Sequence, residues 1–295
     1  MIRVAAVDLG TNSTRLLVAD VADGRVDAIV RRSVVTRLGE GVDRRRRLLP
    51  VPVARVRNVL TDFRRESEQL GAERTLAVAT SAVRDAENGE AFLGEIEWSY
   101  GFVTRLLSGD DEAELTRRGV SAVDDRTLVL DVGGGSTELT TGHFATSIEV
   151  GSVRLTEQFL HADPPSPAEL AAAAAHVTSL LPELDVGEAV GVAGTVAQLA
   201  ALAETDVLTP AEVAGQVETL SKLPLAERRL VPRLDPDRAP VIVAGALIVR
   251  TVLRRFGLDE LRYSVRDLLD GTALEAAALP APVEGDAPPG AYACC

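Results

Sequence analysis

The sequence predicts an α/β fold with two domains of similar design and a cleft between them. The 295 residues suit two domains of ordinary size. A succession of β-rich runs and helical segments fills the first 120 residues and then restarts. A glycine turn also occurs twice, in "VAAVDLGTNSTRLL" and "LVLDVGGGSTEL". The residues that match in order and spacing are Asp8 and Asp131, Gly10 and Gly133, Ser13 and Ser136, and Thr14 and Thr137.

The first domain is expected over residues 1–120. It opens with β-rich runs at 2–8, 14–20 and 25–35, joined by tight turns that indicate antiparallel strands. A helix is expected from about Pro52 to Leu70, because its apolar residues share one face and Gly71 ends it. A strand in "RTLAVAT", a helix from Ser81 towards Trp98, a strand in "FVTRLLSG" and a helix in "DDEAELTRRGV" complete the unit.

The second domain is expected over residues 121–280. Its strands are predicted in "TLVLDV", "STELTTG", "ATSIEV", "EAVGVAG" and "LRYSV". Ser166, Pro167 and Glu169 predict a capping box at the start of one helix, and a long buried helix ends at Gly257. The last helix, in "RDLLDGTALEAAAL", can pack back on the first domain. Residues 281–295 are rich in Pro and Gly, which predicts a disordered tail.

Composition narrows the possible functions. A formal charge of −13 argues against a general nucleic-acid binder, although local arginines and a metal still allow an anionic substrate. The only cysteines, Cys294 and Cys295, offer neither a disulfide framework nor a metal site. The first residues already form a strand, and the most apolar helix is interrupted by Arg250. A cytoplasmic protein without membrane or nucleic-acid partners is expected. A homodimer is also possible.

The two turns predict phosphate loops. Gly and small hydroxyl residues in a hairpin turn expose backbone N–H groups that can cradle phosphate oxygens. The residues expected to do so are Gly10, Thr11, Asn12, Ser13, Gly133, Gly134, Gly135, Ser136 and Thr137. Asp8, Asp131 and Glu138 can meet Mg²⁺ or another divalent cation such as Mn²⁺. For one loop alone, a plain tight hairpin is an equally good interpretation.

The paired loops resemble those of the actin, sugar-kinase and Hsp70 superfamily, which implies two actin-like (ribonuclease H-like) domains. The chain is more similar still to the exopolyphosphatase/guanosine pentaphosphate phosphatase (Ppx/GppA) family in its short, two-domain form. The blocks that match in order are "ATSAVRDAENG", "LLSGDDEAEL", "LVLDVGGGSTEL", "GSVRLTEQF", "VAGTVAQLAAL" and "RAPVIVAGALIV".

The resemblance implies specific roles. Glu112 would be the general base, Asp131 and Glu138 metal ligands with Asp8 in support, and Arg84 a phosphate contact. Acids in a first helical turn are otherwise ordinary dipole complements. Asp111 stands where the family usually has Glu, so its role is in doubt.

Arg84 also stands out without the resemblance. A cation in the first turn after Thr80 and Ser81 opposes the helix dipole unless an anion binds there. Pairing of Arg84 with Asp85 or another nearby acid is the alternative.

Other features of the sequence give weaker evidence of function. Arg44–Arg47 is either a solvated loop or a basic rim that guides a polyanion. Arg154 matches a family block but can equally form a structural salt bridge. Asp267 and Asp270 receive no role, because "SVRDLLDG" departs from the family's commoner ending. The three histidines, His143, His161 and His176, have no metal-ligand spacing.

The resemblance implies a phosphoanhydride hydrolase, an exopolyphosphatase that releases terminal orthophosphate from inorganic polyphosphate. The alternatives are hydrolysis of guanosine pentaphosphate and a non-catalytic sensor that binds alarmones or polyphosphate. A kinase of the wider superfamily is disfavoured, because "VGVAGTVAQL" lacks the double-glycine adenosine loop.

Overall fold

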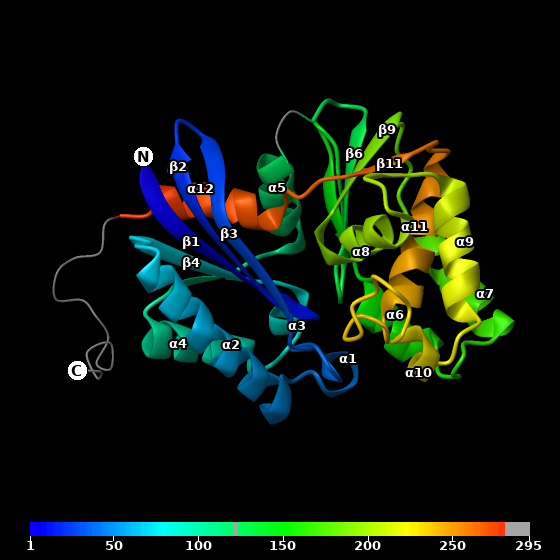
Figure 1. Ribbon diagram of the computed structural model, residues 1–295, viewed down its shortest axis with the longest axis horizontal. Helices are drawn as coiled ribbons and strands as arrows, with labels where there is room; N and C mark the ends of the chain where they lie inside the picture. Colours follow the sequence, from blue (N-terminus) through cyan, green and yellow to red (C-terminus); the bar gives the residue numbers. More distant parts are fainter. Residues whose placement is uncertain (121–122, 281–295) are drawn as a thin grey trace. The chain divides into compact units, whose positions relative to one another are not determined.

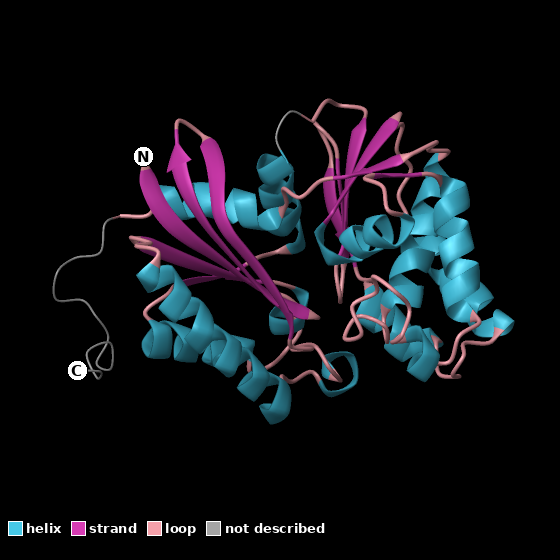
Figure 2. Cartoon of the chain, in the orientation of Figure 1, coloured by secondary structure: helices cyan, strands magenta, loops and turns pink. Residues whose placement is uncertain are grey.

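The computed structural model describes residues 1–120 and 123–280 and contains two compact units. Unit 1 comprises Met1–Gly119 and Leu268–Cys295, and unit 2 comprises Val120–Asp267. Each described unit is a sheet with helices packed on it, which confirms the predicted α/β class (Figure 2). The predicted disordered tail, with Cys294 and Cys295, lies outside the described residues.

The sheet of unit 1 has the strand order β3-β2-β1-β4-β5. β1, β2 and β3 are antiparallel neighbours, whereas β4 runs parallel to β1 and β5 parallel to β4. Tight turns join the antiparallel strands, and helical crossovers precede the parallel ones. The strands are β1 (Ile2–Leu9), β2 (Ser13–Ala22), β3 (Arg25–Val35), β4 (Arg74–Ala79) and β5 (Val103–Leu106).

Helices cover both faces of this sheet (Figure 1). Successive β1 residues point to opposite faces, so Ala5 and Val7 pack with α2 and α4, and Val4 and Ala6 with α12. The helices of unit 1 are α1 (Val42–Arg45), α2 (Pro50–Gln69), α3 (Ser81–Arg84), α4 (Gly89–Tyr100), α5 (Gly109–Val120) and α12 (Leu268–Ala278).

The single helix expected from Ser81 to Trp98 was wrong, because the chain forms two helices there, α3 and α4. A tight turn separates them and returns the chain against α3. At Gly89 a Cβ atom would lie 2.1 Å from the carbonyl oxygen of Val83, so this return requires glycine.

Helix α12 belongs to unit 1 although the whole of unit 2 precedes it in the chain. Gly271 allows close packing on α5, since a Cβ there would lie 2.0 Å from the Leu115 carbonyl oxygen. Arg31 Nη2 in β3 contacts both carboxylate oxygens of buried Asp270 at 2.7 Å. Asp270, which the sequence left without a role, therefore anchors α12 to the sheet.

The sheet of unit 2 has the order β10-β11-β9-β6-β7-β8. β6, β7 and β8 are antiparallel neighbours, and β9 runs parallel to β6, so the arrangement of β1, β2, β3 and β4 recurs. The strands are β6 (Thr127–Val132), β7 (Thr137–Thr140), β8 (Ala145–Ile148), β9 (Glu188–Val192), β10 (Val207–Leu208) and β11 (Leu261–Tyr263).

The buried helix α11 is the centre of the apolar core of unit 2 and packs against α6, α7, α8 and α9. Its C-cap is Gly257 with φ +62°, as the sequence predicts. The helices are α6 (Ser152–Phe159), α7 (Pro167–Leu180), α8 (Ala193–Ala203), α9 (Pro210–Ser221), α10 (Leu225–Arg228) and α11 (Ile242–Phe256).

Capping boxes start two helices of unit 2. The predicted box of α7 is confirmed, with Ser166 and Glu169 bonded reciprocally. Thr209 and Glu212 form the same box at α9, a helix that the sequence analysis missed although "TPAE" carries the same pattern. Across residues 1–120 and 123–280, no helix is both long and apolar enough to cross a membrane.

Candidate active site

The two predicted phosphate loops have the same backbone hydrogen bond, each within its own unit. In the first loop the Gly10 N–H donates to the Ser13 carbonyl oxygen at 3.1 Å, and in the second the Gly133 N–H donates to that of Ser136 at 3.1 Å. Each turn joins two antiparallel strands, β1 with β2 and β6 with β7. The match in sequence is therefore a match in local structure.

Backbone N–H groups of the following segment donate hydrogen bonds to the carbonyl groups of the first loop. The Asn12 carbonyl oxygen accepts from Thr36 N at 3.0 Å and Arg37 N at 2.8 Å, and that of Thr11 accepts from Gly39 N at 2.8 Å. The N–H groups of Thr11 and Asn12 donate to no backbone carbonyl within the described residues. This polarity is that of an anion-binding nest, with its acceptors occupied and its donors available.

The second loop is held in the same way by the start of α6. The Gly133 carbonyl oxygen accepts from Ser152 N at 2.9 Å, and that of Gly134 accepts from Val153 N at 2.8 Å. At Gly151 a Cβ would lie 2.5 Å from the Gly134 carbonyl, so only glycine fits this approach. Gly151 is thus a supporting residue that sequence reasoning missed, although the block "GSVRLTEQF" contains it.

Two buried carboxylates lie side by side at the second loop. Asp131 in β6 is directly opposite Glu138 in β7, so both side chains point to the same face of the sheet. They are 5% and 1% exposed. Ser147, the next residue across the sheet, donates its hydroxyl to Glu138 Oε1 at 2.8 Å. The strand register therefore places two acidic side chains next to each other at the second loop.

The corresponding position at the first loop carries the opposite charge. Asp8 is opposite Arg15, which occupies the place that Glu138 has in the second unit. The Arg15 Nε donates to Asp8 Oδ2 at 2.8 Å, and both side chains are largely buried. Asp8 is therefore compensated by its own sheet. The sequence contains this difference as "STR" in the first loop against "STE" in the second.

Glu112 lies in the first turn of α5 and is 7% exposed. Arg84 Nη1 contacts Glu112 Oε2 at 3.4 Å and donates to the Leu107 carbonyl oxygen at 2.7 Å. The predicted base and the predicted phosphate contact are thus neighbours within unit 1. The dipole argument for Arg84 was wrong, since α3 is a single turn and Arg84 ends it. Its expected alternative, pairing with a nearby acid, is what the structure shows.

The acids next to Glu112 are exposed and serve the helix. Asp111 Oδ2 accepts from the Ser108 N–H at 3.2 Å and from its hydroxyl at 2.5 Å, and Ser108 Oγ accepts from the Asp111 N–H at 3.1 Å. These bonds lower the pKa of Asp111. Ser108 and Asp111 therefore form a reciprocal cap at the start of α5.

The remaining candidates have structural partners. Arg154 forms an ion pair with Glu149, as its structural alternative anticipated. His143 contacts Asp125 at 2.8 Å on the surface. Within residues 1–120 and 123–280, no group of three or more His, Cys, Asp or Glu side chains is arranged to hold a metal. A cation on Asp131 and Glu138 would thus take other ligands from substrate or water.

The duplicated sheets and their glycine turns place the chain in the actin-like class of phosphate-handling proteins. The profile of the Ppx/GppA phosphatase family matches residues 17–278. The chain belongs to this family of phosphatases and is an enzyme of the hydrolase type.

Relatives and solved structures agree with this assignment. The chain is 35% identical to Exopolyphosphatase 2 of Mycobacterium tuberculosis, over 93% of this chain and 98% of that protein. The crystal structure of an exopolyphosphatase-like protein is 30% identical, with a TM-score of 0.87 over 93% of this chain and 97% of that one. The PPX-GPPA enzyme of Aquifex aeolicus is also 30% identical, with a TM-score of 0.77 over 93% and 99%.

Proposed function

We propose that this chain is an exopolyphosphatase, which hydrolyses the terminal phosphoanhydride bond of inorganic polyphosphate and releases orthophosphate. The observation that carries the proposal is the buried carboxylate of Glu112, held next to Arg84 in a chain similar to exopolyphosphatases over nearly its full length. The family supplies the phosphatase chemistry, and the names of the relatives supply the substrate class.

The loops bind the phosphate groups in this proposal. Backbone N–H groups such as those of Thr11 and Asn12 stay fixed when substrate arrives and need no charged side chain. The residues proposed to contact phosphate are Gly10, Thr11, Asn12 and Ser13 in one unit, and Gly133, Gly134, Gly135, Ser136 and Thr137 in the other. Each loop thus offers a phosphate group the same kind of donor.

Glu112 acts as the general base. Its carboxylate orients a water molecule and accepts a proton as the water oxygen attacks the terminal phosphorus. Burial limits the number of side-chain orientations, and the Arg84 contact fixes the carboxylate further. When substrate is bound, the Arg84 guanidinium can donate hydrogen bonds to phosphoryl oxygens instead of to Glu112. The Glu112 carboxylate can then accept a hydrogen bond from the attacking water.

The donor set of unit 2 fits a divalent cation. Asp131 and Glu138 supply adjacent, buried carboxylate oxygens, which are the ligands that Mg²⁺ and Mn²⁺ prefer. A cation bound there would neutralise charge on phosphoryl oxygens of the substrate. Asp8, the corresponding residue of unit 1, is the weaker candidate for a cation ligand, because Arg15 already compensates its charge.

Parallel phosphate-release assays test the proposal. Short polyphosphate, long polyphosphate and guanosine pentaphosphate are compared with Mg²⁺ and with Mn²⁺, using the wild type and Glu112→Gln. We expect release from polyphosphate that the variant largely loses. Faster release from guanosine pentaphosphate would favour the pentaphosphatase alternative. Binding without release from any substrate would favour the sensor.

A further inference from the structure

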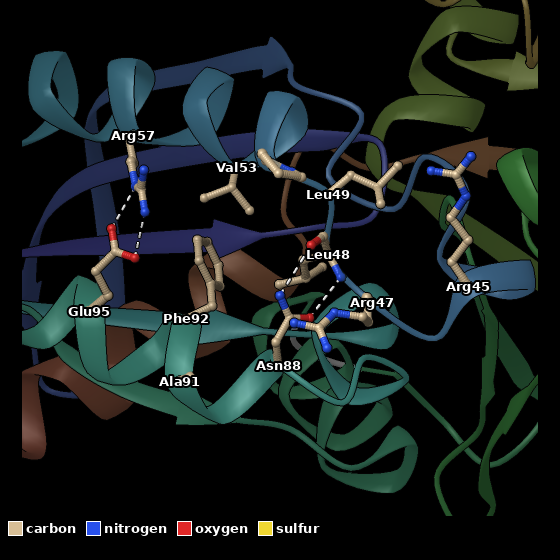
Figure 3. A pocket seen from close by; sticks show the side chains of 11 residues that line it. Arg45, Arg47, Leu48, Leu49, Val53, Arg57, Asn88, Ala91, Phe92 and Glu95 are labelled. Atoms are coloured by element: carbon tan, nitrogen blue, oxygen red, sulfur yellow. Dashed lines mark hydrogen bonds and ion pairs between the residues drawn. The ribbon is translucent and has the colours of Figure 1, made fainter.

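A cavity of about 420 Å³ lies within unit 1, between the first turns of α2 and α4 and the loop that leads into α2 (Figure 3). None of its lining residues belongs to the predicted phosphate loops, the metal site or the base. Its volume is that of small-molecule sites in proteins. The residues that line it are Arg45, Arg47, Leu48, Leu49, Pro50, Val53, Arg57, Asn88, Ala91, Phe92 and Glu95.

The cavity has an excess of positive charge. Glu95 is the one acid among its lining residues, and its two carboxylate oxygens accept from Arg57 at 2.5 Å and 2.6 Å. Arg45 and Arg47 thus supply two positive charges that this acid does not compensate. In Figure 3 the Arg57–Glu95 pair occupies one end, and Val53 and Phe92 separate it from Arg47.

Hydrogen bonds fix the wall that carries the arginines. Asn88 Oδ1 accepts from the Leu48 N–H at 2.8 Å, and Asn88 Nδ2 donates to the Leu48 carbonyl oxygen at 3.1 Å. The Glu87 N–H donates to the Arg46 carbonyl oxygen at 2.7 Å. The arginine loop is therefore tied to the start of α4, which makes the cavity a preformed feature.

The floor is apolar and rigid. Leu48, Val53 and Phe92 are at most 8% exposed and belong to the core cluster beneath α2 and α4. An inorganic polyanion has no group that gains from such a floor, whereas a flat or apolar ring does. Charge at one end and an apolar floor along the other part together select an organic anion.

We propose that this cavity binds an organic phosphate of nucleotide size, as a site additional to the proposed polyphosphatase function. In Figure 3 Arg47 lies beside Asn88 and Arg45 lies apart from it beyond Leu49, so Arg47 binds the phosphate group through charge-assisted hydrogen bonds and Arg45 adds positive charge nearby. The planar base packs over Val53 and Phe92. The run Arg44–Arg47 then divides by position, because Arg45 and Arg47 line the cavity and Arg44 and Arg46 do not.

Calorimetric titration of the full chain tests the ligand class. The probes are the 5′-monophosphates of adenosine, guanosine, cytidine and uridine, compared with adenosine alone and with orthophosphate alone, at constant ionic strength. We expect at least one nucleotide to bind about tenfold or more tightly than either fragment, since it uses both parts of the cavity. If no nucleotide binds more tightly than orthophosphate, the proposal is overturned.

A charge-matched pair of variants locates the site. Arg45→Gln/Arg47→Gln should weaken nucleotide binding by about tenfold or more, since it removes the charged hydrogen bond from Arg47 and the nearby positive charge of Arg45. Arg44→Gln/Arg46→Gln removes the same charge from the same loop and should change binding by less than about threefold. Equal losses in the two variants would show a general electrostatic effect and contradict the site.

Two tryptophan variants of α4, one inside and one outside the cavity, test the position of the bound nucleotide independently. Ala91 lines the cavity and is exposed, so Ala91→Trp should fill the space and abolish nucleotide binding without disturbing the core. Gly94 lies in the same helix outside the lining, and a Cβ there meets nothing within 4 Å. Gly94→Trp should therefore bind like the wild type. Nucleotide binding that persists in Ala91→Trp would place the ligand elsewhere and overturn the proposal.

Discussion

Replacing Glu112 by Gln should lower kcat for phosphate release from polyphosphate by about 10²–10⁴-fold, the usual contribution of a positioned general base. At 1.36 kcal/mol per tenfold, this range corresponds to about 2.7–5.4 kcal/mol of activation free energy. The amide keeps the size of the carboxylate and its place next to Arg84, but it cannot accept the proton of the attacking water. Polyphosphate binding should therefore stay nearly intact.

The structure supplies two matched controls, because three successive acids begin α5 and only Glu112 is buried. Asp110→Asn and Asp111→Asn remove the same charge from the same turn, where the helix-dipole effect amounts to about 0.3–1 kcal/mol. Loss of the dipole interaction alone should therefore lower kcat by about fivefold at most. Asp111→Asn also weakens the hydrogen bonds to Ser108 that cap the helix, which affects stability and not chemistry.

The assay measures orthophosphate release under saturating substrate, with polyphosphate affinity determined separately for each variant. The assignment of Glu112 is refuted if its variant keeps kcat within about threefold of the wild type. It is equally refuted if Asp110→Asn, whose side chain is exposed, loses as much activity as Glu112→Gln.

Four further predictions concern other parts of the molecule. Asp131→Asn and Glu138→Gln should each raise the Mg²⁺ concentration for half-maximal activity by about tenfold or more, because an amide replaces a charged ligand; an unchanged Mg²⁺ titration in both would remove the metal assignment. Arg15→Gln should lower the free energy of unfolding by about 3–5 kcal/mol by leaving the Asp8 carboxylate buried without its guanidinium, and a second change of Asp8 to Asn should recover much of this loss; denaturant unfolding that shows additive losses would contradict the coupling. Gly151→Ala should raise KM for polyphosphate several-fold, since the added Cβ would displace the Gly134 carbonyl, and a KM equal to that of the wild type would show that the second loop tolerates the change. Hydrogen bonds from the N–H groups of Ser166, Ala162 and His161 lower the pKa of Glu169 from 4.5 to about 2. Its contribution to stability is therefore present above about pH 4.5 and lost as pH falls towards 2, so the stability difference between the wild type and Glu169→Ala should shrink over that interval in pH-dependent unfolding.

Local patterns were sufficient to predict most of the fold. β-rich runs between turns located the strands of both sheets except the two-residue β10, and the box formed by Ser166 and Glu169 located the start of α7. The break between α3 and α4 could not be predicted in this way, because it depends on a close approach of Gly89 to Val83. Such approaches join residues through tertiary packing and leave no periodic pattern in the sequence.

The candidate site shows the same division. Repetition of the glycine turn predicted two loops of the same design, and the structure gives both turns the same backbone hydrogen bond. The compensation of Asp8 by Arg15 depends on strand register, since the two residues are seven positions apart and become partners only across a ladder. The pairing of Asp131 with Glu138 follows from the same register in the other unit. Roles that depend on which residues face each other therefore needed the structure.

The position of α12 has a consequence for how the protein is made on the ribosome. The residues that cover one face of β1, β2 and β4 are translated only after all of Val120–Asp267. At about 5–20 residues per second, that apolar face waits on the order of 10 s for its cover. Unit 2 has all its own layers and can fold during this interval. Until then the nascent first half exposes apolar strand residues, and premature termination before Leu268 would release a chain whose sheet lacks the cover of α12.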